Sequence, residues 1–110
     1  MKMKVHKLPK KFTKKWLTAL RSGKYEQGKK YLKNTDEKYC CLGIACLVGG
    51  LTPDEIGGKC IISAMSLFDE MPKKLRSGNA LSGWLVEMND VQGKSFLEIA
   101  DWIETNVEVY

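Results

Sequence analysis

The sequence predicts a compact α+β domain that is mainly helical, with a short β-hairpin forming a small antiparallel sheet. Apolar residues recur at helical spacing near both ends of the chain, and a tyrosine-containing stretch with a turn-like centre follows the first of these segments. The length of 110 residues matches one domain. We therefore expect a single domain over residues 1–110, in which residues 1–8 form a mobile basic arm.

The first helix is expected over residues 9–22. Phe12, Trp16 and Leu20 recur at helical spacing, and lysines occupy other positions of the segment, at 10, 11, 14 and 15. Gly23 suits the left-handed residue that often follows the end of a helix.

The hairpin is predicted to pair residues 29–33 with residues 37–40. The stretch "NTDE" at 34–37 is typical of a turn, and the tyrosines around it favour extended structure.

The run "CCLGIACLVGG" is predicted to form a buried helix that crosses the core and ends at Gly49 and Gly50. Its apolar side chains leave almost no polar face. Gly43 would allow a neighbouring segment to approach closely. A buried strand remains an alternative, because periodicity alone does not separate the two structures.

A short helix should begin after Thr52, with Pro53 in its first turn and Glu55 placed to complete a capping box. Residues 60–62 then favour a strand, and a polar break follows at 69–74.

Two helices are expected in the last third of the chain, at residues 79–90 and 95–107, separated by a loop. Ser95 and Glu98 form the capping-box pattern at the start of the second helix. The apolar face of the first helix is predicted to contain Leu81, Trp84, Leu85 and Met88.

Charge is distributed unevenly. Residues 1–38 contain thirteen Lys or Arg and three acidic residues, whereas residues 39–110 contain five and ten. The basic third favours an anionic partner such as nucleic acid, a phosphorylated small molecule or an acidic protein surface. A solvated lysine-rich face explains the same pattern.

The cysteines do not have the spacing of a metal site or of a redox pair. Cys40 and Cys41 are adjacent, Cys46 follows five residues after Cys41, and CxxC motifs are absent from the sequence. A cysteine protease would need a partnered histidine, and His6 is the single histidine. We interpret the cysteines as core residues. Cys41 keeps an alternative role if the helix begins beside it, because a helix N-terminus can present N–H groups to an anion.

The candidate ligand residues lie in two stretches, "RSGKYEQGKK" and "MND", and at two positions outside them, Tyr39 and Cys41. Arg offers a fork for phosphate, Tyr a stacking surface, and Gln, Asn and Asp polar groups that read a ligand's edges. A solvated turn explains both stretches equally simply. The candidate ligand-binding residues are Arg21, Tyr25, Gln27, Tyr39, Cys41, Asn89 and Asp90.

Familiar nucleotide and nucleic-acid motifs are missing from the chain. It contains neither a GxxxxGK[ST] phosphate loop nor GxGxxG, and RNA-recognition, KH and zinc-finger signatures are also lacking. A helix-turn-helix over residues 83–103 would place an acidic second helix against DNA phosphates, which is unfavourable.

Three blocks resemble a known group of proteins: "WLTALRSGKYEQGKKYL" at 16–32, "YCCLGIACLVGG" at 39–50 and "LVEMNDVQGKSFLEIADWIE" at 85–104. In this order they resemble a widespread family of small, uncharacterised proteins encoded by tailed phages and prophages. The resemblance implies a phage accessory protein and, by association, a role against host defences. It implies no catalytic mechanism.

We therefore expect a non-enzymatic counter-defence protein that sequesters a phosphorylated, nucleotide-type signal in the host cytoplasm, without a cofactor, metal or membrane. One alternative is an inhibitor that binds an acidic host defence protein through the basic N-terminal face. Another is a small hydrolase of a signal nucleotide that uses Asp90 or Cys41. A ligand pocket between protomers of a homo-oligomer is compatible with the leading hypothesis.

Overall fold

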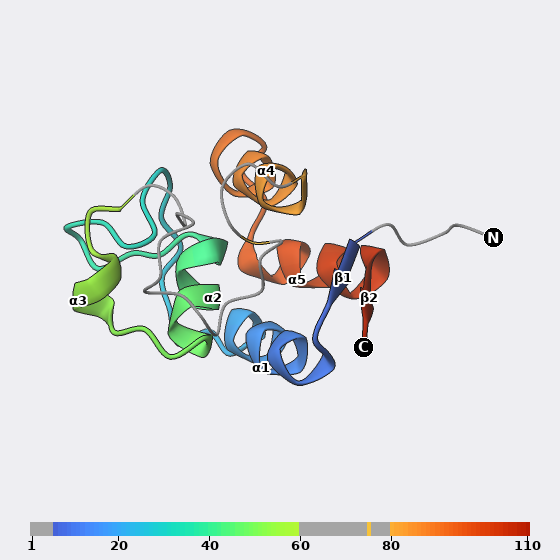
Figure 1. The fold of residues 1–110 in the computed structure, drawn as a ribbon. Coiled ribbons are helices and arrows are strands. Elements are labelled where there is room, and N and C mark those ends of the chain that lie inside the picture. Colours follow the sequence, from blue (N-terminus) through green and yellow to red (C-terminus); the bar gives the residue numbers. More distant parts are fainter. Residues whose placement is uncertain (1–5, 60–74, 76–79) are drawn as a thin grey trace.

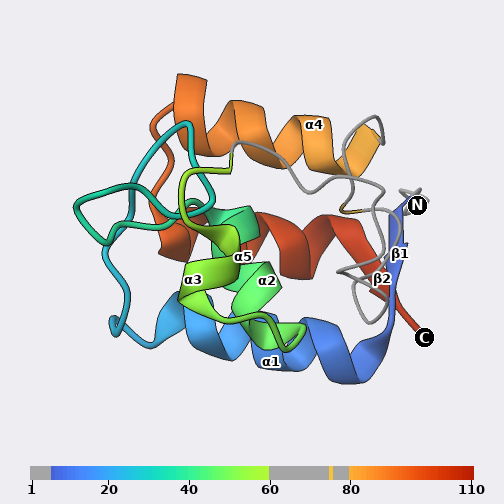
Figure 2. The same ribbon diagram turned by 60° about the vertical axis from the view of Figure 1, so that its left-hand side comes forward.

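The computed structural model describes residues 6–59, 75 and 80–110. Its centre consists of α2 (Cys41–Val48) and α5 (Phe96–Asn106). In both views of the ribbon, α1 (Lys10–Arg21) and α4 (Ala80–Val86) lie on opposite sides of this pair (Figures 1 and 2). The mainly helical α+β class is confirmed.

α1 has the amphipathic character that the sequence predicts. It buries Thr13, Trp16 and Leu20 and exposes its lysines. The Trp16 indole N–H donates to the Cys41 carbonyl oxygen at 3.0 Å, which ties α1 to the start of α2. Gly23 has φ 73°, the left-handed conformation expected just after the helix.

α2 is a helix, which resolves the choice between helix and strand. All residues from Cys41 to Cys46 are buried, and the helix ends before Gly49 and Gly50 as predicted. Gly43 is required by packing, because a Cβ atom there would overlap the backbone carbonyl oxygen of Leu32. The close approach expected at this glycine is therefore confirmed.

The predicted capping signatures are both present. α3 (Pro53–Ile56) begins with a reciprocal capping box between Thr52 and Glu55, and α5 begins with the same arrangement between Ser95 and Glu98. The strand expected at 60–62 and the polar break at 69–74 lie outside the described residues.

The helix predicted over 79–90 differs from the structure in two details. Its last turns form a π-helix, η3 (Glu87–Val91), so helical structure extends into the segment where a loop was expected. Trp84 was expected on the buried face, but it is 49% exposed. The buried stripe instead runs through Leu81, Ser82 and Leu85. Trp84 lies about 100° around the helix from Leu85, at the edge of that stripe.

The predicted antiparallel hairpin is wrong. The turn forms, with the Asn34 side chain accepting from two backbone N–H groups at 2.9 and 3.0 Å, but the flanking segments make a single antiparallel bridge, Lys33–Tyr39. Tyr39 also pairs in parallel with Gln27, and Lys33 with Gly57. These competing partners prevent a two-stranded ladder.

The named sheet is instead parallel and joins segments near the two ends of the chain. β1 (His6–Leu8) pairs with β2 (Val107–Val109) in the register His6–Val107 to Leu8–Val109 (Figure 1). Residues 1–5 of the expected basic arm lie outside the described residues, and its last three residues form β1. Among the helices of the described residues, none is long and apolar enough to cross a membrane.

Candidate functional site

Asn89 is the centre of a buried hydrogen-bond network. Its side chain is on η3, and the residue is 1% exposed. The amide oxygen accepts from the Gln27 side chain at 2.9 Å and from the Cys41 backbone N–H at 3.2 Å. The amide nitrogen donates to the Gly28 carbonyl and to the Asp90 carboxylate, both at 2.8 Å. Asn89 therefore connects η3, the 27–28 segment and the first turn of α2.

Gln27 extends this network to the segment before α5. Its side-chain nitrogen also donates to the Lys94 carbonyl oxygen at 2.7 Å. Gln27, Asn89 and Asp90 are thus brought together, as the binding hypothesis requires, but their polar groups bond to one another and to the backbone. In this arrangement they position the chain and leave little free capacity for a ligand.

Two tyrosines lie on the segments that this network holds in place. Tyr25 precedes Gln27 by two residues, and Tyr39 precedes Cys41 by two. Their rings form an edge-to-face pair with centroids 5.5 Å apart and an interplanar angle of 79°. Backbone bonds between Tyr39 and residues Glu26 and Gly28, at 2.9 and 2.7 Å, hold the two segments side by side.

The tyrosine pair borders a surface pocket of about 450 Å³. The Lys24 ammonium group lies 5.8 Å from the Tyr25 ring centroid. Burial, together with the charge of Glu37, raises the pKa of Tyr39, so its hydroxyl stays protonated at neutral pH. The pocket is lined by Lys24, Tyr25, Glu26, Lys33, Asp36, Glu37, Tyr39, Pro53 and Asp54. We call this the tyrosine pocket.

Cys40, Cys41 and Cys46 belong to the core, and Cys60 lies outside the described residues. Burial raises the pKa of Cys40 to about 11 and that of Cys41 well above its ordinary value, so both are protonated thiols at neutral pH. The backbone N–H of Cys41 is taken by Asn89, which removes the donor that a helix N-terminus would offer to an anion there. Within the part of the chain that the structure describes, no group of three or more His, Cys, Asp or Glu could hold a metal ion.

Arg21 lies apart from the other candidates. Its guanidinium group binds Asp101 and Glu104 of α5, each at 2.9 Å, and these contacts raise its pKa. The fork proposed for a phosphate is therefore occupied by two carboxylates of the same chain.

The structure thus divides the seven candidates into three groups. Tyr25 and Tyr39 line a pocket, the Gln27–Asn89–Asp90 cluster with the Cys41 backbone supports it from inside, and Arg21 pairs elsewhere. Sequence reasoning missed Lys33 as a pocket residue. Its parallel bridge to Gly57, which helps place residues 33 and 53–54 around one pocket, is a non-local contact without a local sequence signal.

Residues 8–49 match a family model described as a domain of unknown function (DUF8296). The matched region extends from the last residue of β1 through α1 and α2, and it includes both tyrosines of the pocket. No curated protein and no solved structure matches the chain.

Proposed function

We propose that this protein is a non-enzymatic binding protein that sequesters a nucleotide-type ligand in the tyrosine pocket. The observation that carries the proposal is the Tyr25–Tyr39 pair in a pocket that Lys24 and Lys33 also line. An aromatic ring stacks on a nucleobase, and an ammonium group binds phosphate. A volume of about 450 Å³ lies in the range of small-molecule pockets, roughly 300–1,000 Å³.

The charges of the pocket restrict the class of nucleotide. Two lysines are accompanied by four carboxylates, those of Glu26, Asp36, Glu37 and Asp54. Carboxylates accept hydrogen bonds from ribose hydroxyls and base amino groups, but they repel a highly charged phosphate chain. The ligand that fits best carries a single phosphate charge, as a cyclic mononucleotide does.

Binding without turnover is favoured by the state of the residues considered for catalysis. The Cys41 thiol is buried and protonated, and the Asp90 carboxylate accepts from the Asn89 amide. The resemblance to small phage proteins supports a counter-defence role, in which removal of a signal nucleotide would protect the phage.

The proposal is tested by calorimetry and thermal-shift measurements with cyclic AMP, cyclic GMP and cyclic UMP, and with ATP as the highly charged comparison. At least one cyclic nucleotide should bind, and ATP should bind more weakly. Base stacking contributes roughly 1–3 kcal/mol, so Tyr25→Ala should weaken binding roughly 5- to 150-fold. The matched control is Tyr31→Ala, because Tyr31 is an exposed tyrosine that does not line the pocket.

Absence of binding by all three cyclic nucleotides, or equal losses in the two tyrosine variants, would overturn the proposal. Hydrolysis of the nucleotide over time, monitored by chromatography, would support the hydrolase alternative instead. Native mass spectrometry of the purified protein adds a direct search for a co-purifying nucleotide.

A second function is favoured by the exposed face of α1. Lys10, Lys11, Lys14 and Lys15 are exposed, and within the described residues no salt bridge involves them. Such a face suits an acidic surface on a host defence protein. A salt-sensitive complex with a host protein that is lost in Lys11→Glu/Lys15→Glu, but kept in Tyr25→Ala, would support this function over the first.

A further inference from the structure

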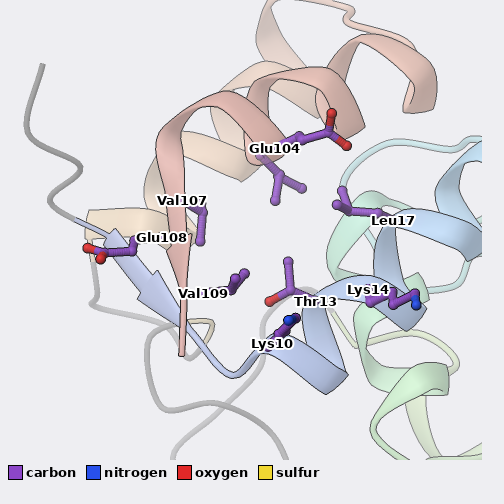
Figure 3. A pocket seen from close by; sticks show the side chains of 9 residues that line it. Lys10, Thr13, Lys14, Leu17, Glu104, Val107, Glu108 and Val109 are labelled. Atoms are coloured by element: carbon purple, nitrogen blue, oxygen red, sulfur yellow. The ribbon is translucent and has the colours of Figure 1, made fainter. Parts of the chain in front are cut away.

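A second surface pocket lies between α1, α5 and β2 (Figure 3). It has a volume of about 400 Å³ and shares no residue with the tyrosine pocket. We call it the α1–α5 groove. Its lining consists of Lys10, Thr13, Lys14, Leu17, Ile103, Glu104, Val107, Glu108 and Val109.

The floor of the groove is apolar. Ile103 and Val107 are buried beneath it, and Figure 3 shows Val107 and Val109 pointing into the hollow, with Leu17 on its far side. Thr13 also lines the floor, but its hydroxyl already donates to the Pro9 carbonyl oxygen at 2.8 Å. The floor therefore offers a ligand apolar contact and little hydrogen bonding.

Four charged residues line the groove, two lysines and two glutamates. Lys10 and Lys14 lie one turn apart on α1, and neither is in a salt bridge within the described residues. Glu104 accepts from Arg21 at 2.9 Å and its carboxylate points away from the hollow (Figure 3). The Glu108 side chain points to the opposite side of β2 from its valine neighbours (Figure 3), as alternation along a strand requires.

We propose that the α1–α5 groove binds a free fatty acid of medium chain length. The alkyl chain lies against Leu17 and Val109, above the buried Ile103 and Val107, and the carboxylate lies beside Lys10 and Lys14. Burial of the alkyl chain removes apolar surface from water, which supplies binding energy that a nucleotide cannot draw from an apolar floor. Charge complementarity selects an acid over a neutral or cationic amphiphile.

This inference is independent of the nucleotide proposal, since the two sites share no residue. The first experiment titrates the wild-type protein with dodecanoate, below its micelle concentration, by isothermal calorimetry. Dodecyltrimethylammonium, which has the same chain and the opposite charge, is the matched comparison ligand. We expect saturable binding of dodecanoate and at least tenfold weaker binding of the cation.

Two pairs of variants locate the binding. Val109→Glu places a carboxylate in the groove at a residue that is 41% exposed, so folding should be kept, and Val91→Glu makes the same change at an exposed position on η3. Lys14→Glu reverses a charge of the groove, and Lys15→Glu reverses its neighbour, which does not line it. Val109→Glu and Lys14→Glu should each weaken dodecanoate binding at least tenfold, while their controls and Tyr25→Ala bind normally.

Several results would overturn the proposal. They are absence of dodecanoate binding, equal binding of the cationic amphiphile, and a loss in Lys15→Glu as large as that in Lys14→Glu. If light scattering shows that Val109→Glu splits a ligand-free dimer, the groove is an interface between copies of the chain. If anionic phospholipid vesicles bind the protein and free dodecanoate does not, the groove faces a membrane surface. Circular dichroism of each variant confirms that the loss is not one of folding.

Discussion

Replacement of Asn89 by alanine should cause a large loss of stability that can be calculated from its contacts. The substitution leaves two backbone groups without their hydrogen-bond partner, the buried N–H of Cys41 and the carbonyl of Gly28. A buried polar group that loses its partner costs roughly 1–3 kcal/mol, so the free energy of unfolding should fall by about 2–6 kcal/mol. Typical domains have roughly 5–15 kcal/mol in total, so the variant should fold but with a much lower denaturation midpoint.

The assay is urea unfolding monitored by tryptophan fluorescence, because Trp16 is fully buried in the native state and becomes exposed on unfolding. The matched control is Asn34→Ala. The Asn34 side chain also accepts from two backbone N–H groups, but in a partly exposed turn where water can replace it, and we expect a loss of about 1 kcal/mol or less. A loss in Asn89→Ala that is no larger than in Asn34→Ala would refute the idea that the network holds the tyrosine segments in place.

Three further predictions concern the core and the surface. Gly43→Ala should destabilise the protein by more than roughly 2 kcal/mol, because a Cβ atom there overlaps the Leu32 backbone and forces α2 to move. Differential scanning calorimetry measures this loss, and an unchanged melting temperature would contradict the close approach of α2 to Leu32. Burial raises the thiol pKa values of Cys40 to about 11 and of Cys46 to about 12, so the folded state keeps protons that the unfolded state releases above about pH 9. The free energy of unfolding should therefore fall between about pH 9 and pH 12, less steeply in Cys46→Ala, and equal slopes in the two proteins would refute this cause. Arg21→Ala should cost at most about 1 kcal/mol in urea unfolding, because its ion pairs are exposed, and the cost should shrink in high salt.

Local signals in the sequence were sufficient for the elements whose stability is local. The Thr52 and Ser95 caps, the left-handed Gly23 and the amphipathic α1 all depend on residues within a few positions of one another. Gly43 also had a readable signal, since a glycine inside an apolar helix indicates a close neighbour, although the identity of that neighbour, Leu32, came from the fold.

The remaining features depend on contacts between distant segments. β2 pairs with β1 across about a hundred residues of chain, and neither three-residue strand has a sequence pattern that predicts its pairing partner. The 27–28 segment and α2 both hydrogen-bond to the Asn89 side chain, which makes a residue typical of turns the centre of a buried network. Arg21 was assigned to a phosphate because its sequence neighbours are basic, but its partners in space are the acids of α5.

The nucleotide proposal is tested most directly by amide NMR spectra of the protein titrated with the tightest-binding cyclic nucleotide. We predict that the largest shifts fall on Lys24, Tyr25, Lys33 and Tyr39, around the tyrosine pocket. The residues of the α1–α5 groove should shift little. Shifts confined to α1, or spectra that do not change with any of the nucleotides, would contradict the account.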